Sequence, residues 1–223
     1  MVRVIFYWGF AFLVALLSIS CSFNPPVDTI VTLIDEDDIW TPSTDLFTLQ
    51  DDGSTLFLFN DKTFKKENGY TFWSQNMNAN TPFRDFSTVV KKVSGNLGAG
   101  FGVVFRCSEI DGTYYLLTVL INTHGSYTIG KVKDGEYEYI QEWKGSQNLR
   151  RGYGVDNLIT ISYEEQSSVY ILSINGQEEQ RFMDTKEPCL SGNSCGYVVV
   201  IAPNEDFTNS KVEVHFKSMQ VRR

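Results

Sequence analysis

Histidine and cysteine are scarce in this chain of 223 residues, which contains two histidines and four cysteines. His124 and His215 lie far apart in the sequence, and no short Cys/His spacing typical of a zinc site is present. Positive charge is scarce as well, since 19 lysines and arginines stand against 27 aspartates and glutamates, for a net charge of −8. A nucleic-acid-binding protein would carry a basic face. The composition therefore argues against a Cys/His zinc protein and against a nucleic-acid partner.

Long apolar runs are absent after the first residues of the chain. The run from Val4 to Leu17 follows the positive charge of Arg3 and is shorter than the roughly 20 residues that a membrane-spanning helix requires. Its length is typical of the apolar core of a signal peptide. We therefore predict that residues 1–20 are a signal peptide and that the rest of the chain is exported.

Small residues precede the first cysteine in the segment Leu17-Ser18-Ile19-Ser20-Cys21. This segment resembles the lipobox of bacterial lipoproteins, and its leucine spacing is similar to that of spirochaete lipoproteins. The resemblance implies that Cys21 is acylated and becomes the N-terminus, and that the protein is anchored to a bacterial membrane, the outer membrane in our reading. Residues 21–27 would then form a tether that its two prolines keep extended. An ordinary secretory peptide and an uncleaved N-terminal anchor are the alternatives.

Helical periodicity is scarce, whereas turn dipeptides recur between apolar runs. Asn-Gly and Asp-Gly tolerate the positive φ angles that tight hairpin turns require. These dipeptides are Asp52-Gly53, Asn68-Gly69, Asp111-Gly112, Asp134-Gly135 and Asn175-Gly176. Residues 158–163 and 212–216 alternate in the way that predicts half-buried strands. The pattern predicts an all-β sandwich or barrel.

Two segments, Tyr114–Ile121 and Tyr197–Ile201, are apolar on both faces, which predicts central strands between packed layers. Helical spacing occurs once, at Phe83, Phe86, Val90 and Val93. The β-branched run that this segment contains, residues 88–90, favours a strand instead.

The strand and turn segments follow one another in a distinctive order along the chain. They are residues 100–106, 112–117, 125–129, Trp143, 157–161, 173–176, 196–198 and 214–221. This order resembles the concanavalin A-like lectin/glucanase superfamily, closest to laminin-G-like modules of bacterial secreted proteins that include 3-keto-disaccharide hydrolase-type domains. The resemblance covers about residues 70–222. It implies a jelly-roll sandwich of two curved antiparallel sheets, one of them concave, over residues 28–223, and implies no particular activity.

Glu136 and Glu138 are the candidate catalytic pair for glycoside hydrolysis. That reaction needs two carboxylates about 5–9.5 Å apart, and residues i and i+2 on a strand lie about 6.6–6.8 Å apart. The two glutamates follow a predicted hairpin turn, where charged residues normally face water. The Glu-x-Asp-x-x-Glu signature of laminarinase-like enzymes of the superfamily is absent. We therefore expect no catalysis from this pair and keep hydrolysis as the alternative.

Three further motifs have ordinary structural explanations. Residues 192–196 match the G-x-S-x-G nucleophile elbow, with Asp206 and His215 following, but a strand is expected after the serine where the elbow needs a helix. The glycines at 95, 98, 100 and 102 lack the order of a phosphate-binding loop and indicate bulges or close backbone approach. The acidic residues 35–38 could ligate structural calcium, but they lack the ligand spacing of a calcium loop. We expect no metal and no cofactor.

The chain is rich in aromatic residues, with 16 Phe, 11 Tyr and 4 Trp. Tyr137, Tyr139 and Trp143 share one face of a predicted strand, opposite to Glu136 and Glu138. Aromatic faces stack on sugar rings, so these residues form a candidate ligand-binding platform, with core packing as the alternative.

Three cysteines remain after Cys21. Cys189 and Cys195 bracket a short loop, and export to an oxidising compartment predicts a disulfide between them, which would leave Cys107 free. The alternative is that all three stay reduced.

These features predict a monomeric, non-catalytic lipoprotein whose β-sandwich binds a carbohydrate or a protein. The sequence contains no nucleophile in a proper setting and no cluster of metal ligands. A glycoside hydrolase and a structural envelope protein are the alternatives.

Overall fold

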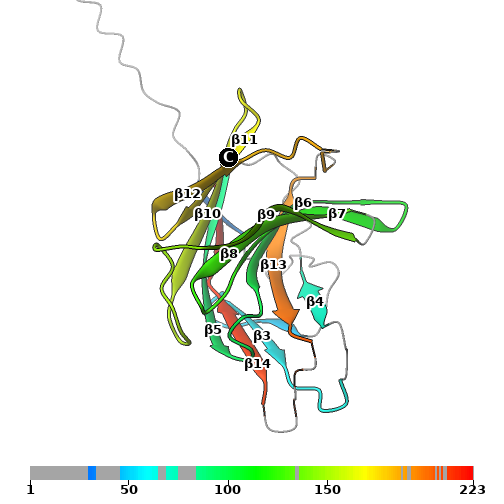
Figure 1. The fold of residues 1–223 in the computed structure, drawn as a ribbon, viewed down its shortest axis with the longest axis vertical. Helices are drawn as coiled ribbons and strands as arrows, with labels where there is room; N and C mark the ends of the chain where they lie inside the picture. Colours follow the sequence, from blue (N-terminus) through cyan, green and yellow to red (C-terminus); the bar gives the residue numbers. More distant parts are fainter. Residues whose placement is uncertain are drawn as a thin grey trace, which may run out of the picture.

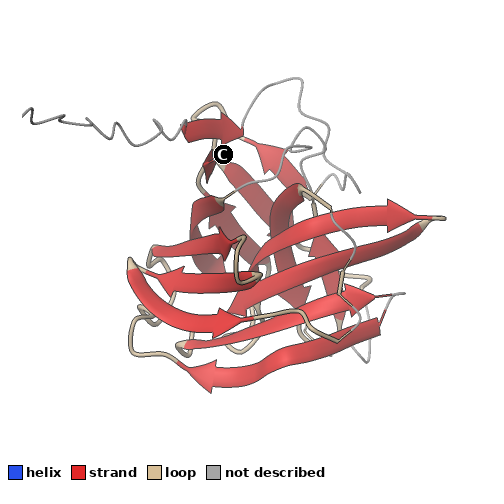
Figure 2. Cartoon of the chain, turned by 90° about the horizontal axis from the view of Figure 1, so that it is seen from above, coloured by secondary structure: helices blue, strands red, loops and turns tan. Residues whose placement is uncertain are grey.

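The computed structural model describes residues 30–33, 46–64, 69–74, 84–133, 136–186, 188–189, 192–203, 205, 207 and 210–222. The predicted signal peptide, Cys21 with its tether, and the acidic residues 35–38 lie outside the described residues. The described residues contain strands and no helix, and thus no helix able to span a membrane. Figure 2 shows these strands, all in red, and confirms the expected all-β class.

The larger of two antiparallel sheets has nine strands. Its order is β12 (Gln177–Phe182), β11 (Val169–Ile174), β10 (Asn157–Glu164), β5 (Asp85–Ser94), β14 (Val212–Phe216), β3 (Thr55–Phe59) and β2 (Phe47–Leu49), with β15 (Met219–Arg222) pairing both β5 and β1 (Ile30–Leu33). Strand β5 contains Phe86, Val90 and Val93, so the strand favoured by the β-branched residues is confirmed there.

The second sheet has six strands and packs against the first, as Figure 1 shows. Its order is β4 (Tyr70–Trp73), β13 (Ser194–Ile201), β6 (Phe101–Ile110), β7 (Thr113–Ile121), β8 (Ser126–Lys133) and β9 (Glu136–Gly145). Strands β6 to β9 follow one another as a meander, whereas β13 and β4 join from distant parts of the chain. The edges of this sheet are therefore β4 and β9.

Tight turns join several of these strands as the dipeptides predict. At the β11–β12 turn, Asn175 and Gly176 have φ angles of 52° and 81°, and at the β6–β7 turn, Asp111 and Gly112 have φ angles of 50° and 78°. Positive φ at both positions is the geometry of the type I′ hairpin. Residues 134 and 135, at the β8–β9 turn, lie outside the described residues.

The core lies between the sheets and is formed by alternate side chains of both. Phe86 and Ile161 of the larger sheet and Phe105 and Val119 of the smaller sheet are at most 1% exposed. Tyr197 stacks on Phe216 across the interface, with ring centroids 4.3 Å apart. Removal of this apolar surface from water is the main force that holds the sheets together.

The outer face of the six-stranded sheet also carries apolar side chains. Val104, Leu116, Leu120 and Val198 alternate with core-facing neighbours and form a second apolar cluster. Both segments predicted to be central strands are confirmed as interior strands, β7 and β13. The outward side chains of this cluster are only 1–7% exposed, as the double apolar pattern predicts, although no second layer of described strands covers this outer face.

Candidate functional site

Two adjoining hollows, of about 510 and 480 Å³, lie on the outer face of the six-stranded sheet. We call them the Trp73 hollow and the Trp143 hollow, after a residue that lines each. Thr71, Leu120 and Val200 line both, so the hollows form one groove. It extends across the sheet from edge strand β4 to edge strand β9. Ligand pockets commonly have volumes of about 300–1,000 Å³.

The floor of the groove is aliphatic. It consists of side chains at alternate positions of the central strands, namely Val104, Leu116, Leu120, Val132, Val198 and Val200. Strand register places them in cross-strand rows, such as Trp73 beside Val198 and Leu116 beside Val132. Polar groups come from threonines at 71, 113, 118 and 128, and from Asn96. A mainly apolar surface with a few placed polar groups is typical of ligand sites.

Aromatic side chains of β9 form one end of the groove. Tyr137, Tyr139 and Trp143 all line the Trp143 hollow, and they are 40%, 50% and 40% exposed. The rings of Tyr137 and Tyr139 are 5.1 Å apart in an edge-to-face arrangement. The predicted common face of these three residues is therefore confirmed in its geometry, and their exposure contradicts the core-packing alternative.

Glycines make room for the aromatic rings. A β-carbon at Gly130 would lie 2.3 Å from Cζ of Tyr137, and one at Gly100 would lie 3.3 Å from Cη2 of Trp143. A β-carbon at Gly102, between these positions on the sheet, would lie 2.1 Å from the backbone oxygen of Val119. Close approach thus explains two members of the glycine cluster, as the sequence indicated.

Tyr137 is held over the floor by a hydrogen bond. Its hydroxyl group lies 3.2 Å from the hydroxyl group of Thr118 on β7, and either can donate. Burial raises the pKa of Tyr137, while the hydrogen bond to Thr118 acts in the opposite direction. The phenol is therefore neutral at physiological pH and offers a hydroxyl group, not a charge, to a ligand.

The opposite end of the groove carries a second aromatic pair, which sequence reasoning missed. Trp73 of β4 and Tyr114 of β7 pack edge to face with ring centroids 4.8 Å apart, and both line the Trp73 hollow. Burial raises the pKa of Tyr114, and so does its hydrogen bond with Glu109. Trp73 and Thr71 occupy alternate positions of a short strand, but only the pairing of β4 with β13 brings that strand to the groove.

The Trp143 hollow is bordered by two loops that a buried lysine and a glutamate hold in place. Lys92, 1% exposed, donates from Nζ to the carbonyl oxygens of Asn96 at 2.6 Å and Ala99 at 3.0 Å. Glu205 accepts from the backbone N–H of Asn96 at 2.9 Å and of Ala202 at 3.3 Å. Asn96, Ala99 and Ala202 all line the hollow, so these contacts determine the shape of its border.

The described lining of the groove is uncharged. None of the described residues that line either hollow is Asp, Glu, Lys, Arg or His. Among the described residues, no group of three or more potential metal-ligating side chains is present. The described lining therefore offers apolar contact and hydrogen bonding to a ligand.

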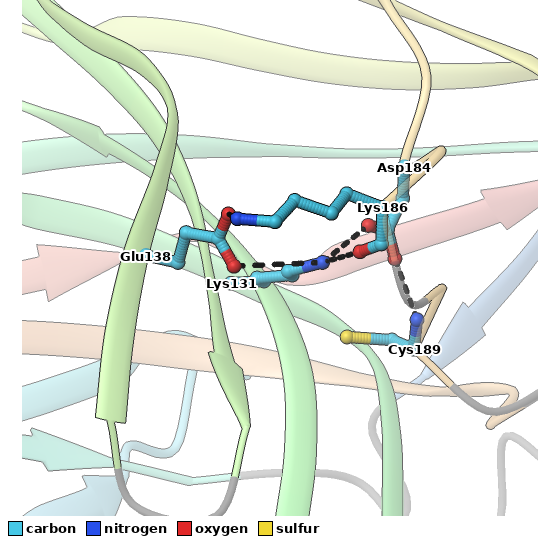
Figure 3. A network of polar contacts seen from close by, with 5 residues as sticks. All are labelled: Lys131, Glu138, Asp184, Lys186 and Cys189. Carbon is cyan, nitrogen blue, oxygen red and sulfur yellow. Dashed lines mark hydrogen bonds and ion pairs between the residues drawn. The ribbon is translucent and has the colours of Figure 1, made fainter.

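The candidate catalytic glutamates lie on the other side of β9 from the groove, because side chains alternate along a strand. Glu138 accepts a hydrogen bond from Nζ of Lys186 at 3.1 Å and lies 3.9 Å from Nζ of Lys131. Figure 3 shows this network, in which Lys131 also pairs with Asp184 at 2.9 Å and donates to the backbone oxygen of Lys186. Lys131 and Asp184 are 2% and 7% exposed, whereas Glu138 is 47% exposed, so Glu138 lies at the solvent-exposed edge of this ion-pair network.

The elbow motif is not assembled into a triad. Ser194 begins β13 in the six-stranded sheet, and no helix follows it among the described residues. His215 lies on β14 of the other sheet, where Nε2 is 2.8 Å from Oε1 of Glu213. A β-carbon at Gly192 would lie 1.9 Å from the oxygen of Cys107, which explains this glycine by close packing. Asp206 lies outside the described residues.

The predicted Cys189–Cys195 disulfide is absent from the structure, in which Cys107, Cys189 and Cys195 are all free. Cys195 points into the core from β13, whereas the backbone N–H of Cys189 is held by Asp184 at 2.6 Å. Burial raises the pKa of Cys189 to about 11 and that of Cys195 to about 12. The thiols are therefore protonated and unreactive as nucleophiles at neutral pH.

A hollow of about 820 Å³, larger than either part of the groove, lies beside Arg106 and Tyr163. Two of its charged residues, Arg106 and Glu164, contact neighbouring side chains. Arg106 donates from Nε to the hydroxyl group of Tyr170 at 2.9 Å and lies 4.8 Å from the ring centre of Tyr163, while Glu164 pairs with Arg181 at 3.1 Å. These contacts give Arg106 and Glu164 a structural role.

No family model and no curated protein matches the sequence. Solved structures are similar in fold. The β-glucanase of Bacillus licheniformis has a TM-score of 0.62 at 8% identity, covering 88% of this chain and 98% of that chain. Carbohydrate binding module CBM66 from Bacillus subtilis has a TM-score of 0.53 at 11% identity, covering 81% and 92%. Alginate lyase A1-II′, of polysaccharide lyase family 7, has a TM-score of 0.52 at 14% identity, covering 80% and 83%.

Proposed function

We propose that this protein, which has a concanavalin A-like jelly-roll fold, is a glycan-binding and non-catalytic module. A lipid on Cys21 anchors the module to a bacterial membrane. The glycan lies in the groove on the outer face of the six-stranded sheet. The proteins of similar fold include a carbohydrate binding module, a β-glucanase and an alginate lyase, which supports a carbohydrate ligand.

One observation carries the proposal: aromatic rings are exposed at a groove lined by uncharged residues. Tyr139 and Trp143 keep 50% and 40% of their surface accessible although a folded chain normally buries such rings. Sugar rings have apolar C–H faces that pack on aromatic and aliphatic surfaces and hydroxyl groups at their edges. The threonines, Asn96 and the hydroxyl group of Tyr137 provide hydrogen-bond partners for those edges.

The proposal that this module is non-catalytic rests on the absence of a carboxylate pair from the described lining of the groove. Hydrolysis of a glycosidic bond needs two carboxyl groups on either side of that bond. Glu136 and Glu138 point away from the groove, and Glu109 reaches its rim only through Tyr114. The alternative of a hydrolase therefore has no carboxyl group among the described residues that line the groove.

The test is a glycan array probed with the full-length chain in detergent micelles. We expect binding to one class of glycan, no release of reducing ends from it, and a loss of binding of about tenfold in Trp143→Ala. The control is Leu49→Ala on the other sheet, since Leu49 is 39% exposed and Trp143 is 40% exposed. Absence of binding to every glycan contradicts the proposal, and turnover that is lost in Glu138→Gln establishes a hydrolase instead.

A further inference from the structure

The chemistry of the groove restricts its ligand further than the proposed function does, and this inference rests on that function. The described lining contains aliphatic, aromatic, hydroxyl and amide groups but no cationic side chain. A carboxylate or sulfate group on a sugar would lose water over the aliphatic floor without gaining a partner of opposite charge. Such burial of an unpaired charge is strongly unfavourable.

The charges outside the groove also disfavour an anionic ligand. Glu109 hydrogen-bonds to Tyr114 at the rim of the Trp73 hollow, and the whole chain has a net charge of −8. The nearby lysines Lys131 and Lys186 pair with Asp184 and Glu138 on the far side of β9. An anionic glycan would therefore be repelled on approach as well as penalised on binding.

The distribution of aromatic rings indicates the length of the ligand. Trp73 and Tyr114 line one hollow, Tyr139 and Trp143 line the other, and Tyr137 and Leu120 line both. Each hollow alone has the volume of a ligand pocket. A single sugar would contact one aromatic pair, whereas a chain of several sugars would contact both.

From these observations we propose that the groove selects an uncharged oligosaccharide that spans both hollows. Apolar C–H faces lie on the rings at the two ends, and hydroxyl groups bind the threonines between them. Affinity rises with chain length until both hollows are occupied. Because no charge contributes, it changes little with salt concentration.

The first test compares neutral oligosaccharides with charged derivatives of the same backbone. Cello-, laminari- and manno-oligosaccharides, from di- to hexasaccharides, are titrated into the full-length protein in micelles by calorimetry, beside their C6-carboxylated forms. Any further glycan that binds on the array is included with its carboxylated form. We expect at least about tenfold tighter binding of the neutral form and less than about twofold change when salt is raised tenfold.

The outcomes separate this inference from the proposed function. Equal or tighter binding of the carboxylated form overturns the selection for uncharged glycans while leaving glycan binding established. Affinity that is the same for di- and hexasaccharides overturns the spanning arrangement. Absence of binding to all neutral and acidic glycans overturns the proposed function and, with it, this inference.

The second test introduces the missing charge. Thr71, which is exposed and lines both hollows, is replaced in Thr71→Arg, and the exposed Thr48 of β2 on the other sheet is replaced in Thr48→Arg as the control. We expect Thr71→Arg alone to bind the carboxylated oligosaccharide about tenfold more tightly than the parent protein, with a gain that salt removes. An equal gain in both variants would show that net charge, not the groove, selects the ligand.

The third test separates the two hollows. Trp73→Ala and Trp143→Ala are each expected to weaken binding of the hexasaccharide by about tenfold, because each removes the aromatic face at one end. Trp73 is partly buried at the edge of the sheet, so its removal also takes away packing contacts. The variant Trp73→Phe and the thermal unfolding midpoint of each variant are therefore measured as well, to separate lost binding from lost stability. Loss of affinity in only one tryptophan variant, with both variants folded, overturns the spanning arrangement.

Discussion

Lys92 shows how one buried charge supports the groove from inside the sandwich. It projects from β5 of the nine-stranded sheet, and its ammonium group donates to two carbonyl oxygens of the loop that follows that strand. Burial lowers the pKa of Lys92 to about 8, while the charge of Glu205 acts in the opposite direction. The carbonyl group of the buried Ala99 depends on this hydrogen bond, because a buried carbonyl group that loses its partner is unfavourable, whereas the carbonyl group of Asn96 also accepts from the N–H of Ala99 at 3.3 Å.

The lowered pKa of Lys92 predicts a pH dependence of stability. Between pH 8 and the ordinary pKa of 10.5, the unfolded chain binds more protons at this position than the folded chain does. The contribution of Lys92 to the free energy of unfolding therefore rises with pH across this range and is constant below it. Urea unfolding at several pH values should show the wild-type protein gaining stability relative to Lys92→Met as pH rises.

Lys91 provides the control for this measurement, because it occupies the neighbouring position of β5 and is less buried. Lys91→Met should keep the pH dependence of the wild-type protein. If the unfolding free energies of wild type and Lys92→Met run parallel from pH 7 to above pH 10, Lys92 does not titrate in this range and the assignment is wrong.

Strands β8 and β9 form the element on which the binding face depends. Their pairing is irregular, with register shifts near Ile129, and it places Tyr139 opposite Gly130. The ring of Tyr137 occupies the space above Gly130 that any side chain would fill. The small residue on one strand thus determines the orientation of an aromatic ring on the next.

Substitution of glycines on this sheet should separate binding from stability. In Gly130→Ala, the new methyl group displaces the far end of the Tyr137 side chain and no backbone atom, so we expect a loss of stability below about 1 kcal/mol and a loss of glycan affinity of about tenfold. In Gly102→Ala, the methyl group meets the backbone of Val119, and we expect a loss above about 2 kcal/mol. Urea unfolding and calorimetry measure the two effects.

Gly145 on β9 is the matched control for both variants, since a β-carbon there would meet no atom within 4 Å. Gly145→Ala should leave affinity and stability within experimental error of the wild type. Full affinity in Gly130→Ala would show that the position of Tyr137 is unimportant for binding.

On the scale of the whole molecule, the two sheets have different tasks. Both sheets contribute to one core, and the central strands of the six-stranded sheet are apolar on their outer face as well. Charged residues are frequent on the edge strands, β9 of the six-stranded sheet and β12 of the nine-stranded sheet. The rings of Tyr139 and Trp143 are exposed beside this buried cluster, and exposed apolar surface on a folded protein usually marks a binding site. The proposed binding surface therefore lies on the outer face of one sheet, away from the core.

The lipid anchor is the prediction that concerns the whole molecule in its cell. Two or more acyl chains on Cys21 would hold it on a bilayer, because each buried CH₂ group contributes about 0.8 kcal/mol. Wild-type protein should separate into the detergent phase, and mass spectrometry should detect an acylated N-terminal Cys21. Cys21→Ala should move to the aqueous phase; a wild-type protein already found there with an unmodified N-terminus contradicts the anchor.

Local patterns in the sequence determined the all-β class, most strand positions and the common face of Tyr137, Tyr139 and Trp143. Alternation along a strand and positive φ in an Asn-Gly turn depend on neighbouring residues, so they can be read without knowledge of the rest of the chain. The same alternation predicted that Glu136 and Glu138 lie opposite to the aromatic residues. The order of turns and strands was sufficient to indicate the jelly roll.

Only the tertiary structure decided which of these faces is a site. The strand order brings β4 beside β13, and thereby places Trp73 and Tyr114 together at the far end of the groove. The exposure of Trp143 and the pairing of Glu138 with Lys186 depend equally on segments distant in sequence. Burial and ion pairing are properties of surfaces that meet after folding, so no local pattern contains them.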